Sequence, residues 1–337
     1  MTLGRLPLVL FCGGGSGGHL TLGLAVADAL AASPGPPELR FLTGERPVEL
    51  RMMGAEPYSH ETFPLAPLGG TVRSRAFAGG FGCCFATARR LAAGRACVAV
   101  GTGGYVSVPG VLGARAGGAT AVLIEPNAVD GRATRALAPL AARVFRTTPN
   151  RKRGLPGEVS VEPRSLFVMG GSAGSSALDA AVPAVVAGLA DAGTLRVRHQ
   201  CGGDVDAVRA AYLAAGTRPE RLEVAPFFPQ AAVRMAEAAV SITRAGALTL
   251  AEAAGYGVRP ILVPYPGAAG HQLANARRHA AIQGGAVVEE GPDLPGRLRA
   301  ALVEELAAPP PVRRLTATDP AAELAERISH ELRRLRG

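Results

Sequence analysis

Glycines and one histidine are the first residues whose types and spacing suggest chemistry. The stretch 11–20 reads FCGGGSGGHL and places five glycines in six positions directly after an apolar run. Glycine lets a backbone approach a ligand closely, and the N–H groups at a helix start favour anions. His19, in the first turn of the expected helix, is either a base acting on that ligand or a surface or capping residue.

The spacing Gly13-x-Gly15-x-x-Gly18 matches the dinucleotide-binding fingerprint, which raises a nicotinamide oxidoreductase as one alternative. That fingerprint needs an acidic residue at the end of the next strand, and only Glu45, beyond a turn, is available. A strand-to-helix turn without any ligand is a second alternative.

A second glycine loop lies in the other half of the chain. Residues 170–176 read GGSAGSS and follow the apolar stretch 166–169. Exposed amides and hydroxyls at a helix start suit a phosphate. No lysine follows the glycines, so this is not the loop of a nucleotide hydrolase. One such loop in each half fits two anionic substrates better than one dinucleotide.

A third turn combines a cation, a bare backbone and a carboxylate. Residues 241–255 read SITRAGALTLAEAAG, with Arg244 and Gly246 at the turn and Thr249 near the start of a helix. A helix N-terminus receives phosphate, and Glu252, one turn further, can accept two hydrogen bonds from a ribose diol. Glu252 can equally be an acid that caps the helix or complements its dipole.

The candidates for metal ligation are weak. Asp204 and Asp206 resemble the Asp-x-Asp pattern of some sugar transferases, but they follow two glycines and open a helix, so we prefer N-capping by Asp204. The five cysteines are odd in number and lack metal-ligand spacing, which favours free thiols in a reducing cytoplasm. We therefore expect no bound metal and no cofactor.

Composition limits the class of protein. The chain has 337 residues, which favours two domains, and 48% hydrophobic with 19% charged residues describes a soluble globular protein. The net charge of +9 admits nucleic acid, an anionic membrane surface or a phosphorylated substrate as partner. No nucleic-acid module or aromatic interleaving supports the first. We find no signal peptide and no apolar stretch of spanning length.

The segment 71–95 mixes arginines with phenylalanines. Phe77, Phe81 and Phe85 recur every four residues among Arg73, Arg75, Arg89 and Arg90. Two interpretations stay open. The segment is a buried helix with a solvated basic face, or it is an interfacial patch that meets acyl chains and anionic headgroups.

Short apolar strands alternate with helix-length segments in both halves, which predicts two parallel, doubly wound α/β domains facing a cleft. We expect strands at 7–12, 39–42, 97–100, 121–124, 166–169, 197–201, 222–224, 240–243 and 260–263. The segment 149–163 is polar and rich in Pro and Gly, and we interpret it as the linker. The expected division is a domain at 1–157, a second domain at 158–318 and a terminal helix at 319–337.

Five segments in order resemble the MurG family of peptidoglycan N-acetylglucosaminyltransferases. They are GGSGGHL at 14–20, GTGGYVSVPGVLGARAGG at 101–118, EPNAVDGRATRALA at 125–138, GGSAGSSALDAAVP at 170–183 and TRAGALTLAEAAGYGVRPILVPYPGAAGHQLANAR at 243–277. The resemblance covers almost the whole chain, and the last segment is the most specific.

The resemblance implies a GT-B fold, in which two Rossmann-like domains face a central cleft and the terminal helix packs back toward the first domain. It implies an inverting hexosyltransferase that moves GlcNAc from UDP-GlcNAc to the 4-OH of MurNAc in undecaprenyl-diphospho-MurNAc-pentapeptide (lipid I), making lipid II. It also implies a peripheral place at the inner face of the cytoplasmic membrane, no nucleic acid, and cell-wall synthesis proteins as further partners.

The resemblance also implies roles for the residues at matching positions. The first candidate for the base, or for the group that orients the acceptor, is His19, and the second is Glu125, with Asn127 nearby. The acceptor side comprises Gly14, Gly15, Ser16, Gly17, Gly18, Gly103, Gly104 and Tyr105. The donor side comprises Ser172 at the diphosphate, Phe228 with Phe227 at the uracil, Arg244, Gly246, Ala247, Leu248 and Thr249 at the phosphates, Glu252 at the ribose, and His271, Gln272 and Asn275 beside the GlcNAc.

This chain departs from the family pattern at three places. Ile124 and Pro126 replace a His and a Gln, Ala173 replaces a Gln, and a Gly-Asn-Pro-x-Arg element before the second domain is absent, leaving Arg151 or Arg153 as substitutes. A catalytically weak homologue acting as a membrane-bound scaffold is therefore one alternative. A related GT-B transferase or epimerase with another acceptor is a second alternative.

Overall fold

The computed structural model divides the chain into two compact units. One comprises Met1–Arg151 and Thr318–Gly337, and the other Lys152–Ala317. The structure describes residues 5–15, 17–65, 75–151, 155–171, 174–268, 270–309 and 312–335.

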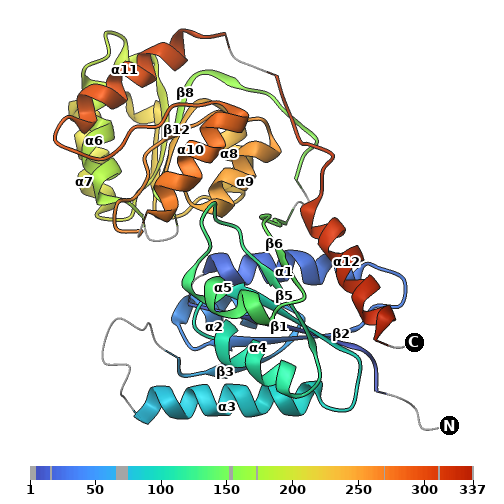
Figure 1. The fold of residues 1–337 in the computed structure, drawn as a ribbon. Coiled ribbons are helices and arrows are strands. Elements are labelled where there is room, and N and C mark those ends of the chain that lie inside the picture. The colour runs from blue at the N-terminus through green and yellow to red at the C-terminus, as the bar shows by residue number, and fades with distance from the viewer. Residues whose placement is uncertain are drawn as a thin grey trace. The chain divides into compact units, whose positions relative to one another are not determined.

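The described part of the first unit forms a six-stranded parallel sheet in the order β3-β2-β1-β4-β5-β6, with helices on both faces (Figure 1). Its main elements are β1 (Leu8–Gly13), α1 (Gly17–Ala31), β2 (Glu38–Gly44), α2 (Pro47–Gly54), β3 (Ser59–Phe63), α3 (Arg75–Ala92), β4 (Cys97–Gly103), α4 (Ser107–Ala116), β5 (Thr120–Ile124), α5 (Arg132–Leu137), β6 (Arg143–Phe145) and α12 (Pro320–Arg334).

Strand β1 is apolar at every position because both of its faces are covered. Leu8, Leu10 and Cys12 belong to the core cluster that includes residues of α3 and α4. Val9 and Phe11 belong to the cluster that includes α1 and α12. Burial on both sides explains why a parallel strand reads as a continuous apolar run rather than as an alternation.

Helix α12 packs on the first unit, although the whole second unit, Lys152–Ala317, lies between it and that unit's sheet in the sequence. Its apolar residues Leu324, Ile328 and Leu332 follow at intervals of four and are buried in the cluster shared with α1. The Asp319 carboxylate caps the helix by accepting hydrogen bonds from the backbone N–H groups of Ala321 and Ala322, at 3.0 and 3.3 Å. The predicted return of the terminal helix to the first domain is confirmed.

Helix α3 contacts α4 closely. A Cβ placed on Gly113 of α4 would lie 2.1 Å from the Phe85 carbonyl oxygen, so glycine is required at this crossing. Phe77 and Phe81 are half-buried against the core, with ring centroids 6.4 Å apart. The contacts favour a packed helix, while the side chains of Arg73 and Arg75 lie outside the described residues. No helix formed by the described residues is long and apolar enough to cross a bilayer.

The described part of the second unit contains a five-stranded parallel sheet in the order β10-β9-β8-β11-β12 (Figure 1). Its elements are β8 (Glu162–Met169), α6 (Ser176–Ala187), β9 (Arg196–Gln200), α7 (Val205–Ala214), β10 (Leu222–Ala225), α8 (Ala231–Glu237), β11 (Ala238–Thr243), α9 (Ala247–Gly255), β12 (Ile261–Leu262), α10 (His271–Gln283) and α11 (Leu294–Ala307), with an antiparallel pair of β7 (Glu158–Val159) and β13 (Arg313–Arg314).

Two local expectations have clear outcomes. Asp204 is the N-cap of α7, where its Oδ1 accepts from the N–H groups of Asp206 and Ala207, so the capping interpretation is confirmed. The guanidinium of Arg151 donates to Glu56 and to Asp28 within the first unit. Arg151 is therefore engaged within this unit, its use as a substitute for the missing arginine of the family element stays a prediction, and Arg153 lies outside the described residues.

Candidate active site

Each sheet has one place where a ligand crevice is expected. In the first unit, α1 after β1 and α4 after β4 cover opposite faces of the sheet, and β1 and β4 are neighbours. In the second unit the same holds for β8 with α6 and β11 with α9. The crevice beyond the carboxyl ends of such strand pairs is the usual ligand site of doubly wound sheets.

Two glycine turns meet at the first of these places. The N–H of Gly14 donates to the Gly103 carbonyl at 3.3 Å. Gly104 has a φ of +80°, and a Cβ there would lie 1.5 Å from the Gly14 carbonyl oxygen. The Ser107 hydroxyl is buried and supports the turn by accepting from the Gly103 N–H at 2.9 Å and contacting the Cys12 carbonyl at 2.5 Å. Only glycine permits this approach of the two loops.

The buried carboxylate of Glu49 holds the first loop, a role that the sequence reasoning missed. Its Oε1 accepts from the N–H groups of Gly15 at 2.8 Å and Gly44 at 3.2 Å. Its Oε2 accepts from the Arg46 N–H at 3.2 Å, and the Arg46 guanidinium donates to the Gly15 carbonyl. The available signal was Pro47 at the first helical position of α2 and Glu49 at the third, as in a capping box.

His19 lies against both glycine turns. Its Nδ1 is 3.1 Å from the Gly14 carbonyl oxygen, and its ring covers Gly103, where a Cβ would lie 3.0 Å from Nε2. A carbonyl only accepts, so Nδ1 carries the proton and Nε2 carries the lone pair. Burial lowers the pKa of His19 below its ordinary value, while the Gly14 carbonyl, Glu125 and Glu49 act in the opposite direction. The arrangement provides a neutral imidazole.

Glu125 is buried and fully engaged. Its Oε1 accepts from the backbone N–H of Asn127 at 3.0 Å and from Asn127 Nδ2 at 2.9 Å. Its Oε2 accepts from the Gly131 N–H at 2.8 Å and from the Thr134 hydroxyl at 2.6 Å. Four hydrogen bonds therefore already occupy both oxygens of this carboxylate. Glu125 and Asn127 therefore shape the loop before α5, and His19 is the stronger candidate for a base.

The other predicted acceptor residues lie around the same turns. Gly17 and Gly18 begin α1, and a Cβ on Gly15, whose φ is +91°, would lie 3.0 Å from the Tyr105 ring. Ser16 lies outside the described residues. The structure thus brings Gly14, Gly15, Gly103, Gly104, Tyr105 and His19 together at the carboxyl ends of β1 and β4.

At the corresponding place in the second unit, the glycine loop rests on the turn after β9. A Cβ on Gly174 would lie 2.0 Å from the Cα of Gly202. Ser175 caps α6 by accepting from the Leu178 N–H at 3.3 Å. Ser172 and Ala173 lie outside the described residues. Because Gly174 contacts Gly202 so closely, the position of Gly174 depends on the turn after β9.

A buried network of hydrogen bonds fixes the turn after β9, at Gly202 and Gly203. The sequence reasoning missed this network. Asp179 Oδ2 accepts from the N–H groups of Gly202 at 3.2 Å and Gly203 at 3.1 Å. Its Oδ1 is 3.1 Å from His199 Nε2, and His199 Nδ1 is 2.8 Å from the Tyr212 hydroxyl. Burial raises the pKa of Asp179, but hydrogen bonds from His199 and the neighbouring groups outweigh it and hold the pKa below its usual value.

The Arg244–Gly246 turn is attached to the same place through the backbone, because the Arg244 N–H donates to the Met169 carbonyl at 3.1 Å. The Arg244 side chain is buried, pairs with Glu290, donates to the Val263 carbonyl at 3.1 Å and lies over the Tyr265 ring. Its charge is thus neutralised within the unit. Gly246 is the N-cap of α9 and supplies no side-chain cap, which leaves the N–H groups of Ala247, Leu248 and Thr249 for an anion.

Helix α10 clamps this turn from both sides. Gln272 Oε1 accepts from the Ala245 N–H at 3.2 Å and from the Tyr265 N–H at 2.9 Å. Asn275 Nδ2 donates to the Ala245 carbonyl at 3.2 Å. His271 begins the helix, and its Nδ1 is buried with no hydrogen-bond partner among the described residues. Gln272 and Asn275 position the phosphate turn, and His271 offers an unsatisfied polar atom.

Glu252 and Phe228 differ in what they can contact. The half-buried Glu252 carboxylate makes no hydrogen bond or ion pair with any described residue, and burial raises its pKa to about 7. Phe228 is 4% exposed and packs edge-on against Phe167 in the core, whereas Phe227 is 71% exposed. This corrects the expectation for Phe228, because its buried ring is unavailable to the uracil. Phe227 is the exposed member of the pair.

Comparisons with known proteins agree with this organisation. Residues 9–146 match the glycosyltransferase family 28 N-terminal domain and residues 165–330 the family 28 C-terminal domain. A UDP-N-acetylglucosamine–N-acetylmuramyl-(pentapeptide) pyrophosphoryl-undecaprenol N-acetylglucosamine transferase of Sorangium cellulosum is 37% identical, covering 95% of this chain and 85% of the relative. The transferase of the same name from Alkalilimnicola ehrlichii is 34% identical, covering 91% and 92%.

Solved structures give the same architecture. The crystal structure of Acinetobacter baumannii MurG aligns with a TM-score of 0.68 and 26% identity, over 96% of this chain and 99% of that chain. The glycosyltransferase SnogD from Streptomyces nogalater aligns with a TM-score of 0.60 and 18% identity, over 97% and 99%, and shares the fold alone. The predicted GT-B fold of two Rossmann-like domains is confirmed.

Proposed function

This chain belongs to glycosyltransferase family 28 and, within it, to the MurG transferases, and we propose that most of the predicted site residues serve the reaction of these enzymes. The chain is a hexosyltransferase that moves N-acetylglucosamine from UDP-GlcNAc to lipid I and makes lipid II. The observation that carries this function is that relatives with this activity in their names are 32–37% identical over most of the chain. The oxidoreductase alternative is wrong, since both domains match those of a glycosyltransferase family.

The donor belongs to the second unit. The uncapped start of α9 receives the diphosphate through the N–H groups of Ala247, Leu248 and Thr249, and the dipole of the helix favours the charge that develops on the departing UDP. Glu252, which has no partner among the described residues, accepts from the ribose diol. His271 Nδ1 contacts the sugar, while Gln272 and Asn275 hold the turn in place. Ser172 stays a prediction at the diphosphate.

The acceptor belongs to the first unit. The amides of the Gly14–Gly18 loop and of Gly103 and Gly104 face its diphosphate, with Tyr105 beside them. Nε2 of neutral His19 takes the proton of the 4-hydroxyl as that oxygen attacks the anomeric carbon. The bond from that carbon to the β-phosphate oxygen breaks, and UDP leaves with the electron pair. Glu125 and Asn127 act as positioning residues.

The acceptor's polyprenyl chain places the reaction at a membrane surface. We therefore place the protein at the inner face of the cytoplasmic membrane, as a peripheral protein. Its excess of basic residues supports this placement because anionic headgroups attract arginine. Cell-wall synthesis proteins stay predicted partners.

The test is a transfer assay with purified protein, UDP-[¹⁴C]GlcNAc and lipid I, with the product separated by chromatography. We expect lipid II, and none with muramyl-free polyprenyl phosphate as the acceptor. Tight UDP-GlcNAc binding without transfer would instead support the scaffold alternative, and transfer to another acceptor would support the related transferase.

A further inference from the structure

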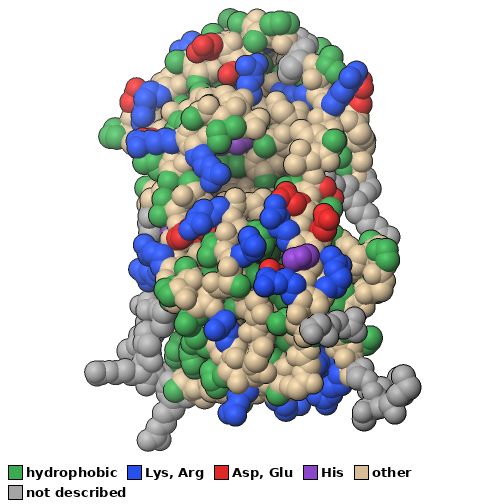
Figure 2. Space-filling model, turned by 45° about the vertical axis from the view of Figure 1, so that its right-hand side comes forward, with side chains coloured by type: hydrophobic (Ala, Val, Ile, Leu, Met, Phe, Trp, Pro, Cys, Tyr) green, Lys and Arg blue, Asp and Glu red, His purple; other side chains and the backbone are tan. Residues whose placement is uncertain are grey.

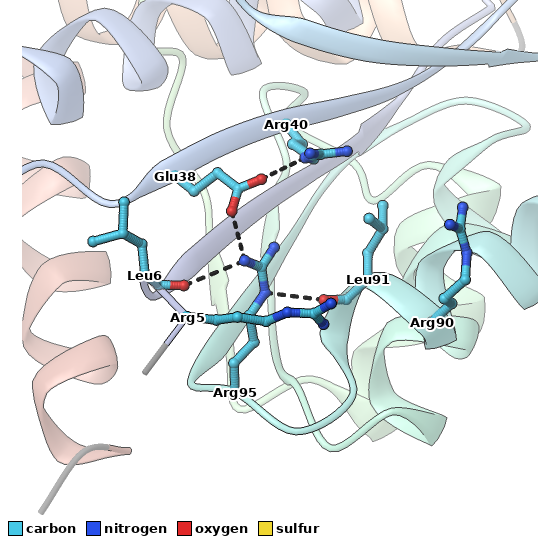
Figure 3. A pocket seen from close by; sticks show the side chains of 7 residues that line it. All are labelled: Arg5, Leu6, Glu38, Arg40, Arg90, Leu91 and Arg95. Carbon is cyan, nitrogen blue, oxygen red and sulfur yellow. Dashed lines mark hydrogen bonds and ion pairs between the residues drawn. The ribbon is translucent and has the colours of Figure 1, made fainter. Parts of the chain in front are cut away.

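A pocket of about 410 Å³ lies at the end of the first unit's sheet opposite to the glycine turns. It is lined by residues just before β1, at the start of β2 and at the end of α3 (Figure 3). The lining residues are Arg5, Leu6, Glu38, Arg40, Arg90, Leu91 and Arg95. The proposed transfer reaction uses none of them, because the acceptor loops follow the carboxyl ends of the strands.

Four arginines and one glutamate are among the described residues that line this pocket, and two of the arginines, Arg40 and Arg95, bind the glutamate (Figure 3). Glu38 Oε1 accepts from Arg40 Nε at 2.5 Å, and Glu38 Oε2 accepts from Arg95 Nη1 at 2.5 Å. The hydrogen bond from Arg95 outweighs desolvation and lowers the pKa of Glu38, so this carboxylate stays ionised at neutral pH. Four positive charges and one negative charge leave an excess of three.

Part of the pocket is rigid. The Arg95 side chain is only 7% exposed, and besides Glu38 it donates to the Leu91 carbonyl at 3.0 Å and to the Leu6 carbonyl at 3.3 Å. These bonds tie the end of α3 to the segment that enters β1. Arg95 thus holds one side of the pocket in place.

Two cations have no close partner. Arg5 makes no hydrogen bond or ion pair with any described residue. Arg90 is 71% exposed, and the nearest carboxylate oxygen, of Glu61, is 3.9 Å away, which contributes little at the surface. Basic side chains occur over much of the face drawn in Figure 2, and some of them lie beside acidic ones. The pocket is distinguished by two lining arginines, Arg5 and Arg90, that have no close partner among the described residues.

We propose that this pocket binds a phosphate group, either on a soluble phosphorylated molecule or on a lipid headgroup. An excess of three charges suits a multivalent phosphate better than a single carboxylate, and the planar forks of arginine bind phosphate oxygens in pairs. Among the described residues, no aromatic side chain lines the pocket, which disfavours the stacking that single-stranded nucleic acid requires. This site is separate from the site of the transfer reaction, and the anion that it binds takes no part in that reaction.

The test compares the full-length protein with the double variant Arg5→Ala/Arg90→Ala. Sodium pyrophosphate binding is measured by titration calorimetry in the presence of saturating UDP-GlcNAc, and vesicle binding by co-sedimentation with phosphatidylglycerol or with phosphatidylcholine alone. The charge-matched control is Arg277→Ala/Arg314→Ala, which removes two exposed arginines of the second unit. Lipid II formation and the melting temperature establish that each variant is folded.

We expect the pocket variant to lose at least tenfold in affinity for one class of probe, while the control keeps the wild-type value. A loss with pyrophosphate alone identifies a soluble ligand, and a loss that includes phosphatidylglycerol vesicles identifies a headgroup. Unchanged binding of both probes, or an equal loss in the control variant, overturns the proposal.

Discussion

Nδ1 of His19 lies 3.1 Å from the carbonyl oxygen of Gly14, in the glycine loop that precedes its own helix. This contact fixes the tautomer and leaves the lone pair on Nε2. Burial lowers the pKa of the ring, so the neutral form predominates at neutral pH. The glycine loop and the proposed base are thus joined in one structural unit.

His19→Gln should lower kcat by roughly 10²- to 10⁴-fold, the usual contribution of a general base. Because the base acts when neutral, the wild-type rate should fall only below pH 6.5, the ordinary histidine value, as the ring becomes protonated. Lipid II formation measured from pH 5 to 8 checks both points. His60→Gln, an exposed histidine of the same unit, is the control, and equal rates for the two variants would remove His19 from the mechanism.

The glycine loops, most strands and the terminal helix could be predicted because their signals are local. Apolar runs ended by glycine identified β1, β4 and β8, and the charged amphipathic pattern of the tail identified α12. Glu49 could not be placed, because one of its partners is 34 residues away and only the fold brings them together. The burial of Phe228 and the pairing of Arg244 with Glu290 were missed for the same reason.

The approach of Gly104 to Gly14 leads to a prediction about acceptor handling. Gly104→Ala should raise the acceptor KM at least tenfold, because the added methyl group would overlap the Gly14 carbonyl and separate the two turns. Gly118→Ala is a matched control, since its φ of +95° is equally unfavourable for alanine but nothing lies within 4 Å. The control should lose about 1 kcal/mol of stability with unchanged kinetics. Identical effects of both variants on KM would contradict this account.

The raised pKa of Glu252 predicts how donor affinity depends on pH. If the ionised carboxylate accepts from the ribose, UDP-GlcNAc binding releases a proton below pH 7, and affinity rises as the pH increases through about 7. The expected gain from pH 6 to pH 8 is about tenfold, from the change in the ionised fraction. Calorimetric titration with Glu252→Gln should show weak, pH-independent binding, while the exposed Glu304→Gln should behave as wild type. A wild-type affinity that is flat across this range would argue against the ribose contact.

Asp179 binds the turn at Gly202, which contacts Gly174 of the glycine loop predicted to bind the donor. The effect of Asp179 on donor binding can therefore be distinguished from that of Tyr212, at the far end of the same hydrogen-bond network. Asp179→Asn removes a charge that accepts from Gly202, Gly203 and His199, so the turn under Gly174 loosens and the donor KM should rise several-fold with little change in kcat. Tyr212→Phe removes only the hydroxyl at the far end, 2.8 Å from His199 Nδ1, and leaves the glycine contacts intact. Both variants should lose roughly 1–3 kcal/mol of stability because each leaves a buried group unsatisfied. Only the Asp179 variant should alter the donor KM. If the donor KM rose equally in both variants, in step with their loss of stability, Asp179 would have only a structural role.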